Sequence, residues 1–500
     1  MNDTNTETGS GDDAVLLEQI RGAMKKVHEG VGMAFRGQHP KGLGVVHGAF
    51  QVHEVPIAYR VGVFAEPKSY ATWIRFSIAK EWDDRSPNVR GMAIKLLGVP
   101  GEKLAPGEAE ATTHDFVLAT HPVFFARDAK HFLQFLVMKG AQAKEAGEAK
   151  IQGKSPEELA ALEMQHLKQL VAAFPVTAKF FTTAESPLTQ QYFSQTPYQY
   201  GNYVVKYFVQ HPDSKDRLVN EMQQRLATSP QAVQFEFGIE VQTNPETMPI
   251  DDATQPWNSP ERVILGTITI PPQDFQSDER KKFGENLSFS PWHALPEHRP
   301  LGSLNEARRA PYIDSSTERH KTSQTVREEP ELSDFNALTL GRYFEFFKRG
   351  DYVGMQSCLH PDVEFSDTGF DLRGKEVGAM WHMIISKGIQ VSKGESTCAN
   401  GECTIHWECD YVFRKDAKST PRPVHNVVTS KFKFEGGLIR SQHDECDFWR
   451  WFEQAMGPIG KGLHLLDIVE DAFEWLVGHD VPPDIEKKAR AAVKETGRTK

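Results

Sequence analysis

Apolar and polar residues alternate along this chain with two different periods, which predict strands and helices. Period-two alternation predicts four strands in the first 270 residues, at 73–80, 91–98, 233–243 and 262–270. Helical spacing of apolar residues predicts a helix over 14–30. A further helix starts at the Ser155 capping box, with proline at its first position, and ends near Phe174. Strands dominate, so we expect an antiparallel β-barrel with inserted helices, whose interior or mouth can hold a cofactor.

A polar segment divides the chain into two domains. The residues between Tyr312 and Ser333 are charged and nearly free of apolar side chains, which predicts a linker. Beyond it, the pattern over 333–367 predicts a capped helix, a short helix and a turn into a strand. The predicted organisation is a disordered start (1–13), a first domain (14–320), a linker (321–332), and a second domain with a helical extension (333–500). The predicted fold class is α+β in both domains.

Charge and composition limit the classes of partner. The net charge is −11, from 57 basic and 68 acidic residues, which argues against binding to nucleic acid or to an anionic membrane surface. The first residues, MNDTNTETGSGDD, contain neither a basic stretch nor an apolar one of the kind found in signal peptides. No apolar run is long enough to span a membrane. We therefore expect a cytoplasmic protein.

Cysteine usage points to reduced thiols. The chain has five cysteines, an odd number, and their spacing matches no zinc pattern. All lie after residue 350: Cys358, Cys398, Cys403, Cys409 and Cys446. The sequence predicts that they are free and mostly buried.

Two short strings carry residues suited to a haem site. A phenol has an ordinary pKa of about 10, so it ligates iron near neutral pH only when its phenolate form is favoured. In the string RRAPY, Arg308 lies one helical turn before Tyr312 and can favour that form. Far upstream, His39 in the string HPKGLG can move a proton during cleavage of a peroxide O–O bond. Neither string alone is strong evidence for a haem site. A tyrosine on a helix is commonly a surface residue, and a histidine in a glycine-rich stretch more often has a structural role.

Between these strings the chain resembles a known family. Five segments resemble, in order, those of the haem catalase superfamily: 35–50, 73–80, 89–98, 114–132 and 289–312. The likeness is greater to the small catalase-like branch than to the large catalases. It covers roughly the first two-thirds of the chain and is weakest between about residues 140 and 280.

The resemblance implies haem b as cofactor and a role for each matched residue. Tyr312 would ligate the iron, and His39 would move the proton, with Ser77 accepting a hydrogen bond that orients the imidazole. The arginines Arg36, Arg75 and Arg308 would pair with haem propionates or with the ligand phenolate. Apolar walls would come from the phenylalanines Phe124, Phe125 and Phe132.

One departure from the family bears on activity. Where catalases carry an asparagine that helps hold hydrogen peroxide, this chain reads LATHP, with Ala119 and Thr120. Thr120 can donate one hydrogen bond, but its side chain is shorter and stiffer than a carboxamide. Loss of one positioned donor can cost about a hundredfold in rate. We therefore expect reaction with organic hydroperoxides or slow peroxidase activity, rather than vigorous disproportionation of hydrogen peroxide. A hydroperoxide isomerase of the allene-oxide-synthase type and a non-catalytic haem sensor remain alternatives.

The second domain resembles a different family. The segments 333–367, 371–381 and 425–451 are similar to the SnoaL-like branch of the nuclear transport factor 2 superfamily. This implies a cone of curved sheet around helices, with a pocket. In SnoaL-type cyclases an aspartate and a histidine do acid-base work, and the nearest residues here are His443, Asp444 and Asp447. The same residues also read as the polar end of a strand before an aromatic core patch. Many domains of this kind only bind or dimerise, so a homodimer through this domain is the simpler expectation.

Overall fold

The computed structural model describes residues 11–34, 36–79, 89–180, 186–212, 222, 226, 232–368, 370–399, 401–413 and 420–456. The chain divides into two compact units, Met1–Glu329 and Pro330–Lys500. Residues 1–10 of the predicted disordered start, and the predicted helical extension after 456, lie outside the described residues. Residues 11–13 are helical, because helix α1 spans Gly11–Val31 and its first turn carries two aspartates that favour a helix start.

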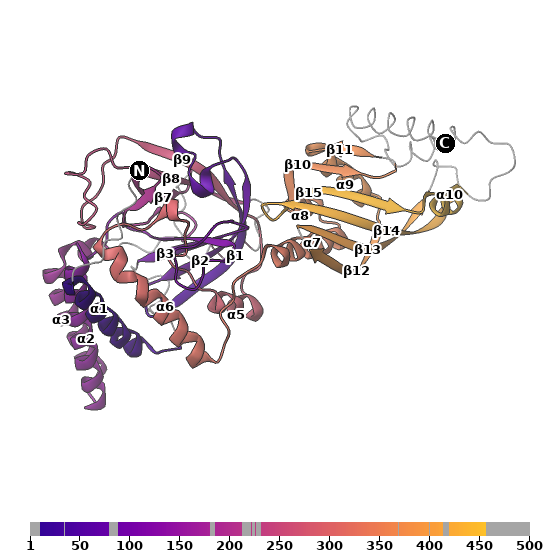
Figure 1. Ribbon diagram of the computed structural model, residues 1–500. Helices are drawn as coiled ribbons and strands as arrows, with labels where there is room; N and C mark the ends of the chain where they lie inside the picture. The colour runs from indigo at the N-terminus through magenta and orange to yellow at the C-terminus, as the bar shows by residue number, and fades with distance from the viewer. Residues whose placement is uncertain are drawn as a thin grey trace. The chain divides into compact units, whose positions relative to one another are not determined.

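Within the described residues, eight strands of the first unit form a closed antiparallel ring in the order β1-β2-β3-β4-β5-β7-β8-β9 (Figure 1). The ring closes because β9 pairs with β1, while β5 pairs with both β4 and β7. The strands are β1 Lys41–Val52, β2 Ser69–Ile78, β3 Arg90–Leu97, β4 Thr113–Ala119, β5 Tyr192–Phe193, β7 Tyr203–Gln210, β8 Val233–Val241 and β9 Arg262–Ile270, with β6 Tyr198–Tyr200 added to β7. The four strands predicted from alternation are β2, β3, β8 and β9, so this prediction is confirmed.

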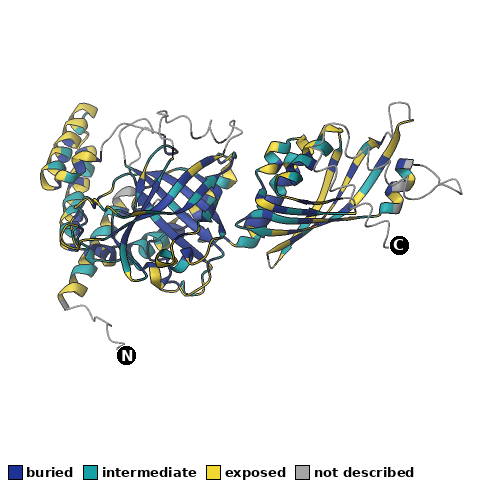
Figure 2. Cartoon of the chain, turned by 90° about the horizontal axis from the view of Figure 1, so that it is seen from above, coloured by how far each residue is buried: buried dark blue, intermediate teal, exposed yellow. Residues whose placement is uncertain are grey.

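Aromatic side chains fill the barrel interior. Phe237 stacks on Phe64, with ring centroids 5.7 Å apart, and lies 4.8 Å from the ring of Phe116. Ile74 and Phe76 of β2 are fully buried in the same core, and the barrel strands as a whole are mostly buried (Figure 2). These side chains pack the interior of the barrel, so of the two predicted places for a cofactor, interior or mouth, the interior is filled by the core. Residues that alternate with these core positions point to the outer face of the sheet, where the cavity described below lies.

Helices cover part of this outer face. Helix α2 (Ala129–Ile151) packs against α1, against α3 (Pro156–Ala173) and against α6 (Ser303–Ser323), and α5 (Asp278–Asn286) packs on β1 (Figure 1). The predicted capping box is confirmed, because Ser155 Oγ accepts from Glu158 N and Glu158 Oε2 accepts from Ser155 N. Short 3-10 helices are Ile57–Tyr59, Gly62–Phe64, Pro175–Lys179 and Pro296–His298. None of the helices in the described part of the chain is long and apolar enough to cross a membrane.

Most of the segment predicted as a linker belongs to the first unit. Helix α6 continues to Ser323, and Glu328 forms a parallel bridge with Leu287. The division between the units falls after Glu329. The segment is polar because its side chains pair with charged groups of the first unit, which a count of apolar residues cannot reveal.

The second unit is a six-stranded sheet with helices against it. The sheet order is β11-β10-β15-β14-β13-β12, antiparallel except for the parallel pair β10 and β15. The elements are α7 Leu332–Arg349, α8 Tyr352–Gln356, β10 Leu359–Ser366, β11 Asp371–Arg373, α9 Lys375–Ser386, β12 Gln390–Ala399, β13 Glu402–Phe413, β14 Arg422–Glu435, β15 Leu438–Cys446 and α10 Phe448–Met456. Its core joins Tyr343 and Phe347 of α7 and Trp381 of α9 to Trp407 and Phe432 of the sheet. The α+β fold class predicted for both domains is confirmed.

One cysteine prediction was wrong. Cys398 and Cys403 form a disulfide between β12 and β13, where they face each other in the strand register with Cα atoms 4.1 Å apart. The spacing alone did not reveal this, because it depends on where the hairpin turns. The other three cysteines, Cys358, Cys409 and Cys446, are free as expected.

Candidate functional site

A cavity of about 680 Å³ lies between the outer face of the barrel and the helices. Its walls come from β2, β3, β4, α1, α2, α3 and α6 and from the segment before β1. Nine of the ten residues predicted from the catalase resemblance line it: Arg36, His39, Arg75, Ser77, Phe124, Phe125, Phe132, Arg308 and Tyr312. Residues more than 270 positions apart in the sequence therefore meet at one site.

His39 is held in an unusual conformation at one wall. Its φ of 50° lies in the left-handed region, which typically costs about 1–3 kcal/mol for a residue other than glycine. Its Nδ1 forms a hydrogen bond of 3.2 Å with Ser77 Oγ, and Arg75 Nη2 donates to its carbonyl oxygen at 3.2 Å. Burial, and then the positive charges of Arg75 and Arg308, lower the pKa of His39 to about 4. The imidazole is thus neutral at pH 7 and can accept a proton.

Gly91 makes room for this arrangement, although the sequence did not single it out. A Cβ atom at this position would lie 2.6 Å from Ser77 Oγ and 2.8 Å from His39 Nδ1. In the strand register Gly91 lies opposite Ser77 on one side and Ala119 on the other. These three residues form a row across β2, β3 and β4, all facing the cavity. The row defines the floor next to the imidazole.

Tyr312 and Arg308 lie on α6 at the cavity, as their helical spacing predicts. Arg308 Nη2 donates to Tyr312 Oη at 2.9 Å, and Arg308 Nη1 donates to Asn305 Oδ1 at 3.2 Å. Burial is the largest effect on the pKa of Arg308 and lowers it, but Tyr312 and Tyr198 outweigh burial and leave the pKa raised. The arrangement places a fixed positive charge against the phenol oxygen.

Three more arginines gather at the cavity with little opposite charge. Arg36 Nη1 lies 2.6 Å from Glu285 Oε2, and Arg75 Nη2 lies 3.8 Å from Glu285 Oε1. Burial lowers the pKa of Arg36, Arg75 and Arg319, and that of Arg319 falls to about 9. The Nε atoms of Arg75 and Arg319 are buried and have no hydrogen-bond partner in the described part of the chain. Arg319 was missed, yet it lies seven residues after Tyr312 and so shares its helix face.

The prediction for Thr120 was wrong in position. Its hydroxyl accepts a hydrogen bond from Arg90 N at 3.2 Å, and it is not among the residues that line the cavity. The neighbouring Ala119 lines the cavity instead. Successive residues of a strand face opposite ways, so a shift of one position moves a side chain off the wall.

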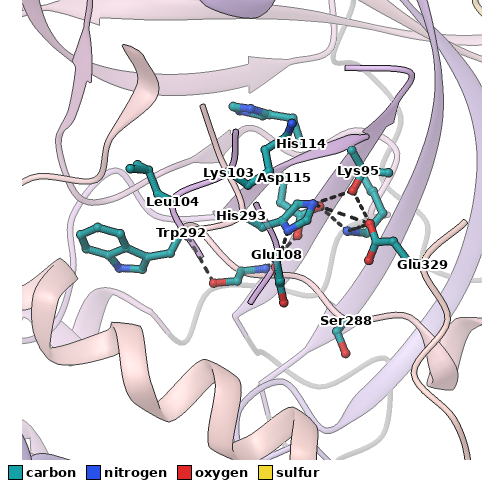
Figure 3. Close-up of polar contacts among 12 residues, drawn as sticks. Lys95, Lys103, Leu104, Glu108, His114, Asp115, Ser288, Trp292, His293 and Glu329 are labelled. Atoms are coloured by element: carbon teal, nitrogen blue, oxygen red, sulfur yellow. Dashed lines mark hydrogen bonds and ion pairs between the residues drawn. The ribbon is translucent and has the colours of Figure 1, made fainter. Parts of the chain in front are cut away.

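A second group of charges, in part fully buried and in part half-buried, lies outside the cavity, and we call it the ion cluster (Figure 3). Its members are Lys95, Glu108, Asp115, His293, Arg327 and Glu329. Lys95 Nζ lies 2.8 Å from Asp115 Oδ1 and 3.3 Å from Glu329 Oε1. Burial raises the pKa of Glu108, but His293 and Arg327 outweigh burial and lower the pKa to about 2. The cluster attaches Arg327 and Glu329, at the end of the first unit, to its barrel.

In the second unit the predicted acid-base residues do not meet. His443 and Asp444 are neighbours on β15 and point to opposite faces, His443 exposed and Asp444 buried. His443 Nδ1 bonds to Ser366 Oγ at 2.8 Å, while Asp447 Oδ1 accepts from Arg450 N near the start of α10. The proposed set of three was wrong, because strand alternation separates adjacent residues.

Asp444 instead belongs to a buried polar chain that the sequence did not reveal. Ser430 Oγ donates to Asp444 Oδ1 at 2.5 Å, and Gln442 Nε2 donates to the same oxygen at 2.9 Å. Tyr343 and Trp407 extend the chain by donating to Gln442 and Ser430. Burial raises the pKa of Asp444 to about 7, although these two hydrogen bonds lower it. These residues lie on four different elements, so no local motif connects them.

Solved structures of catalases are similar to part of this chain. A bacterial catalase is 16% identical, with a TM-score of 0.44, over 64% of this chain and 63% of that chain. Catalase A from Saccharomyces cerevisiae is 18% identical, with a TM-score of 0.40, over 57% of this chain and 61% of that chain. The chain thus spans about three fifths of the length of these catalases. No curated protein matches the chain.

The second unit has matches of its own. A putative polyketide cyclase from Silicibacter sp. is 21% identical, with a TM-score of 0.22, over 24% of this chain and 95% of that chain. The family model for the SnoaL-like domain matches residues 340–442. Residues 340–442 therefore form a SnoaL-like domain, as the sequence predicted.

Proposed function

We propose that the first unit binds haem b and acts on hydrogen peroxide or organic hydroperoxides. The proposal rests mainly on one observation: two hydrogen-bonded pairs of side chains line the same cavity. Tyr312 with Arg308 comes from α6, and His39 with Ser77 comes from the barrel wall and the segment before it. A ligand oxygen and a neutral base at one site are what peroxide chemistry on iron requires.

The residues around the cavity fit a haem group in size, charge and shape. A volume of about 680 Å³ lies within the range of roughly 300–1,000 Å³ typical of sites for small molecules and cofactors. Propionates would provide acceptors for the unpartnered Nε atoms of Arg75 and Arg319. Phe124 and Phe125, stacked with ring centroids 4.2 Å apart, offer a flat apolar wall.

Each residue then has a defined task. When bound, haem supplies the redox chemistry by which a peroxide O–O bond is broken. Tyr312 would hold the iron through its phenol oxygen, which receives the hydrogen bond of Arg308. His39, neutral and oriented by Ser77, would take up a proton from the peroxide and return it to the leaving oxygen. The phenylalanines would keep bulk water away from the site.

Haem titration of the full chain tests the cofactor and its ligand. We expect wild-type protein to develop a Soret band at one haem per chain, and Tyr312→Phe to lose or grossly alter it. A matched control is Tyr203→Phe, since Tyr203 is not among the residues that line the cavity and its ring centre lies 5.5 Å from that of Tyr59. An unchanged spectrum in Tyr312→Phe would reject Tyr312 as ligand, and no uptake by wild type would reject haem.

The reaction is tested on the haem-loaded protein. His39→Ala should retain the Soret band and lose reactivity in stopped-flow mixing with peroxide, and undiminished kinetics would exclude His39 from proton transfer. Three assays separate the alternatives: oxygen release indicates a catalase, donor oxidation a peroxidase, and loss of hydroperoxide without a donor an isomerase. A stable haem complex that is inactive in all three assays would indicate a haem binder and overturn the enzymatic part of the proposal.

A further inference from the structure

A smaller cavity lies beside the one described above, where the ends of α5 and α6 meet the start of β1 (Figure 1). Its volume is about 390 Å³, within the range of roughly 300–1,000 Å³ typical of sites for small molecules. We call it the side cavity, and its walls include Ala34, Pro40, Lys41, Lys282, Glu285 and Arg319. Pro40 and Arg319 line both cavities, so a molecule in the side cavity lies against residues that also border the larger one.

Positive charges outnumber negative ones around the side cavity. Its three cations are the nearly fully buried Arg319, the half-buried Lys41 and the exposed Lys282. Among the described residues that line it, Glu285 is the one carboxylate, and its oxygens already lie 2.6 and 3.8 Å from two arginines of the larger cavity. Within the described part of the chain the ammonium of Lys282 has neither a hydrogen bond nor an ion pair. The side cavity can therefore accept a negative charge that the chain does not supply.

The helix ends beside the side cavity do not oppose an anion as bare ends would. Carbonyl groups at the C-terminal end of a helix carry partial negative charge. Leu287 O, at the end of α5, accepts hydrogen bonds from Arg36 Nη2 at 2.7 Å and from Arg319 Nη2 at 3.2 Å. At the end of α6, His320 O accepts from Thr325 N at 3.0 Å. The partial charges that would repel an anion are thus offset by donors of the chain itself.

A small carboxylate suits both the charge and the walls of the side cavity. Hydrogen bonds between an ammonium group and a carboxylate are among the stronger ones in proteins, and Lys282 is available to form one. Pro40 and Ala34 provide an apolar side against which a ring can pack. Because Lys282 is exposed, the carboxylate would be held weakly enough to exchange with solvent, as a substrate must in every turnover.

Reduction of a hydroperoxide requires a second substrate that supplies electrons. In the proposed function haem occupies the larger cavity, so this substrate needs a place outside that cavity and next to it. The side cavity is such a place, because Arg319 borders both. The part of the protein in such a reaction is to bind and position the donor.

We propose that the side cavity binds a small carboxylate-bearing reductant, with its carboxylate at Lys282, and that this molecule is the electron donor for reduction of the hydroperoxide. For a phenolic acid, two donor molecules each lose one electron and one proton as a phenol O–H bond breaks. The hydroperoxide takes up these two electrons and two protons and becomes an alcohol and water. The role as donor rests on the proposed function. The binding of the carboxylate does not, since it requires only the side cavity and Lys282.

Binding is measured first, by calorimetric titration of the full chain without haem, at low ionic strength. The probes are protocatechuate, a phenolic carboxylate, and its methyl ester. We expect wild type to prefer the acid, and Lys282→Met to weaken binding of the acid about fivefold, the upper end for one exposed ion pair. Lys282→Arg should retain most of the affinity.

The matched control is the neighbouring Lys281→Met. Lys281 is exposed, lies 3.8 Å from Asp278 and is not among the residues that line the side cavity, so this variant should bind like wild type. Equal affinity for acid and ester, or an equal loss in the variants of Lys281 and Lys282, would overturn the proposal.

Haem titration with and without saturating protocatechuate tests whether the two ligands occupy different cavities. We expect the Soret titration to give the same haem affinity in both cases, within about twofold. A haem affinity that falls in proportion to the concentration of the acid would mean that the two ligands compete. The side cavity would then be part of the haem site, and the proposal would be overturned.

Turnover by haem-loaded protein tests the role as donor. Lys282→Met should raise KM for protocatechuate about fivefold and change kcat little, while KM for the methyl ester and for the hydroperoxide stays as in wild type. An equal loss with acid and ester would mean that Lys282 has a structural role and would overturn the proposal. If wild type oxidises neither donor yet binds the acid through Lys282, the proposed function fails and the carboxylate site stands.

Discussion

The outer face of the barrel carries two groups of buried and half-buried charges that differ in how they are neutralised. In the ion cluster, Lys95 and Arg327 each contact two carboxylates, and His293 contacts two as well. At the cavity, the four arginines Arg36, Arg75, Arg308 and Arg319 face one carboxylate, Glu285, and the phenol of Tyr312. Among the residues that the structure describes, every charge of the ion cluster contacts an opposite charge, whereas the arginines at the cavity outnumber the acidic groups beside them. Buried charges that are matched internally hold the fold, whereas unmatched ones indicate a charge that a ligand brings.

The largest effect on stability is expected in the ion cluster, where the charges are paired with opposite charges. Lys95→Met would leave Asp115 buried without its closest cation, and breaking a buried pair in this way costs about 3–5 kcal/mol in the free energy of unfolding. Urea denaturation of the full chain, followed by circular dichroism, measures the loss.

The matched control for Lys95→Met is an exposed ion pair. Lys144 and Glu148 lie 3.8 Å apart on α2, and Lys144→Met should change the free energy of unfolding by no more than about 0.5 kcal/mol. If the Lys95 variant lost less than about 1 kcal/mol, Asp115 would be protonated or hydrated in the folded protein, and the cluster would not be a matched structural group.

Asp444, a buried carboxyl group in the second unit, extends the comparison. It has no cation beside it among the described residues, and its hydrogen bonds come from the neutral groups of Ser430 and Gln442. The pKa of Asp444 is about 7, above its ordinary value of about 3.9, so the folded state prefers the protonated acid. The stability that this proton provides is complete below about pH 4 and is lost as pH rises through 7.

The variant Asp444→Asn tests this, since an amide resembles the neutral acid. At pH 4 the variant and wild type should unfold with similar free energies, and by pH 8 the variant should be the more stable by a few kcal/mol. Urea denaturation across this pH range gives the difference. A difference that does not change with pH would mean that Asp444 is ionised or neutral in both states alike.

The site could be predicted from sequence only where its residues are local or follow a family pattern. Arg308 and Tyr312 are one helical turn apart and match the family pattern, so they were predicted together, whereas Arg319 shares their helix face but was not singled out. The ion cluster joins Lys95 to Glu329, 234 residues apart, and nothing local in either segment signals the contact. The pairing of His443 with Asp444 failed for the opposite reason: neighbours in sequence were treated as neighbours in space, although β15 alternates.

Replacing an arginine at the cavity should affect ligand binding more than stability, whereas replacing Lys95 should mainly lower the stability of the fold. Arg75→Met removes one hydrogen bond to the His39 carbonyl and the 3.8 Å contact with Glu285, but it also relieves repulsion from Arg36 and Arg319. Stability without haem should therefore fall by less than about 1 kcal/mol. Haem affinity, measured by titration of the Soret band, should fall about tenfold because a propionate loses its charged partner. A large loss of stability with intact haem affinity would make Arg75 a structural residue like Lys95.

The smallest expected effect concerns the position that differs from the catalases. Thr120 directs its hydroxyl to Arg90 N and not into the cavity, so Thr120→Asn should change oxygen release by less than about twofold. Ala119→Asn is the informative counterpart, since Ala119 stands in the row with Gly91 and Ser77 that forms the floor beside His39. A carboxamide there would face the imidazole and could hold a peroxide oxygen, so oxygen release should rise. If Thr120→Asn raised oxygen release and Ala119→Asn did not, β4 would present its other face to the cavity, and the assignment of the floor would be wrong.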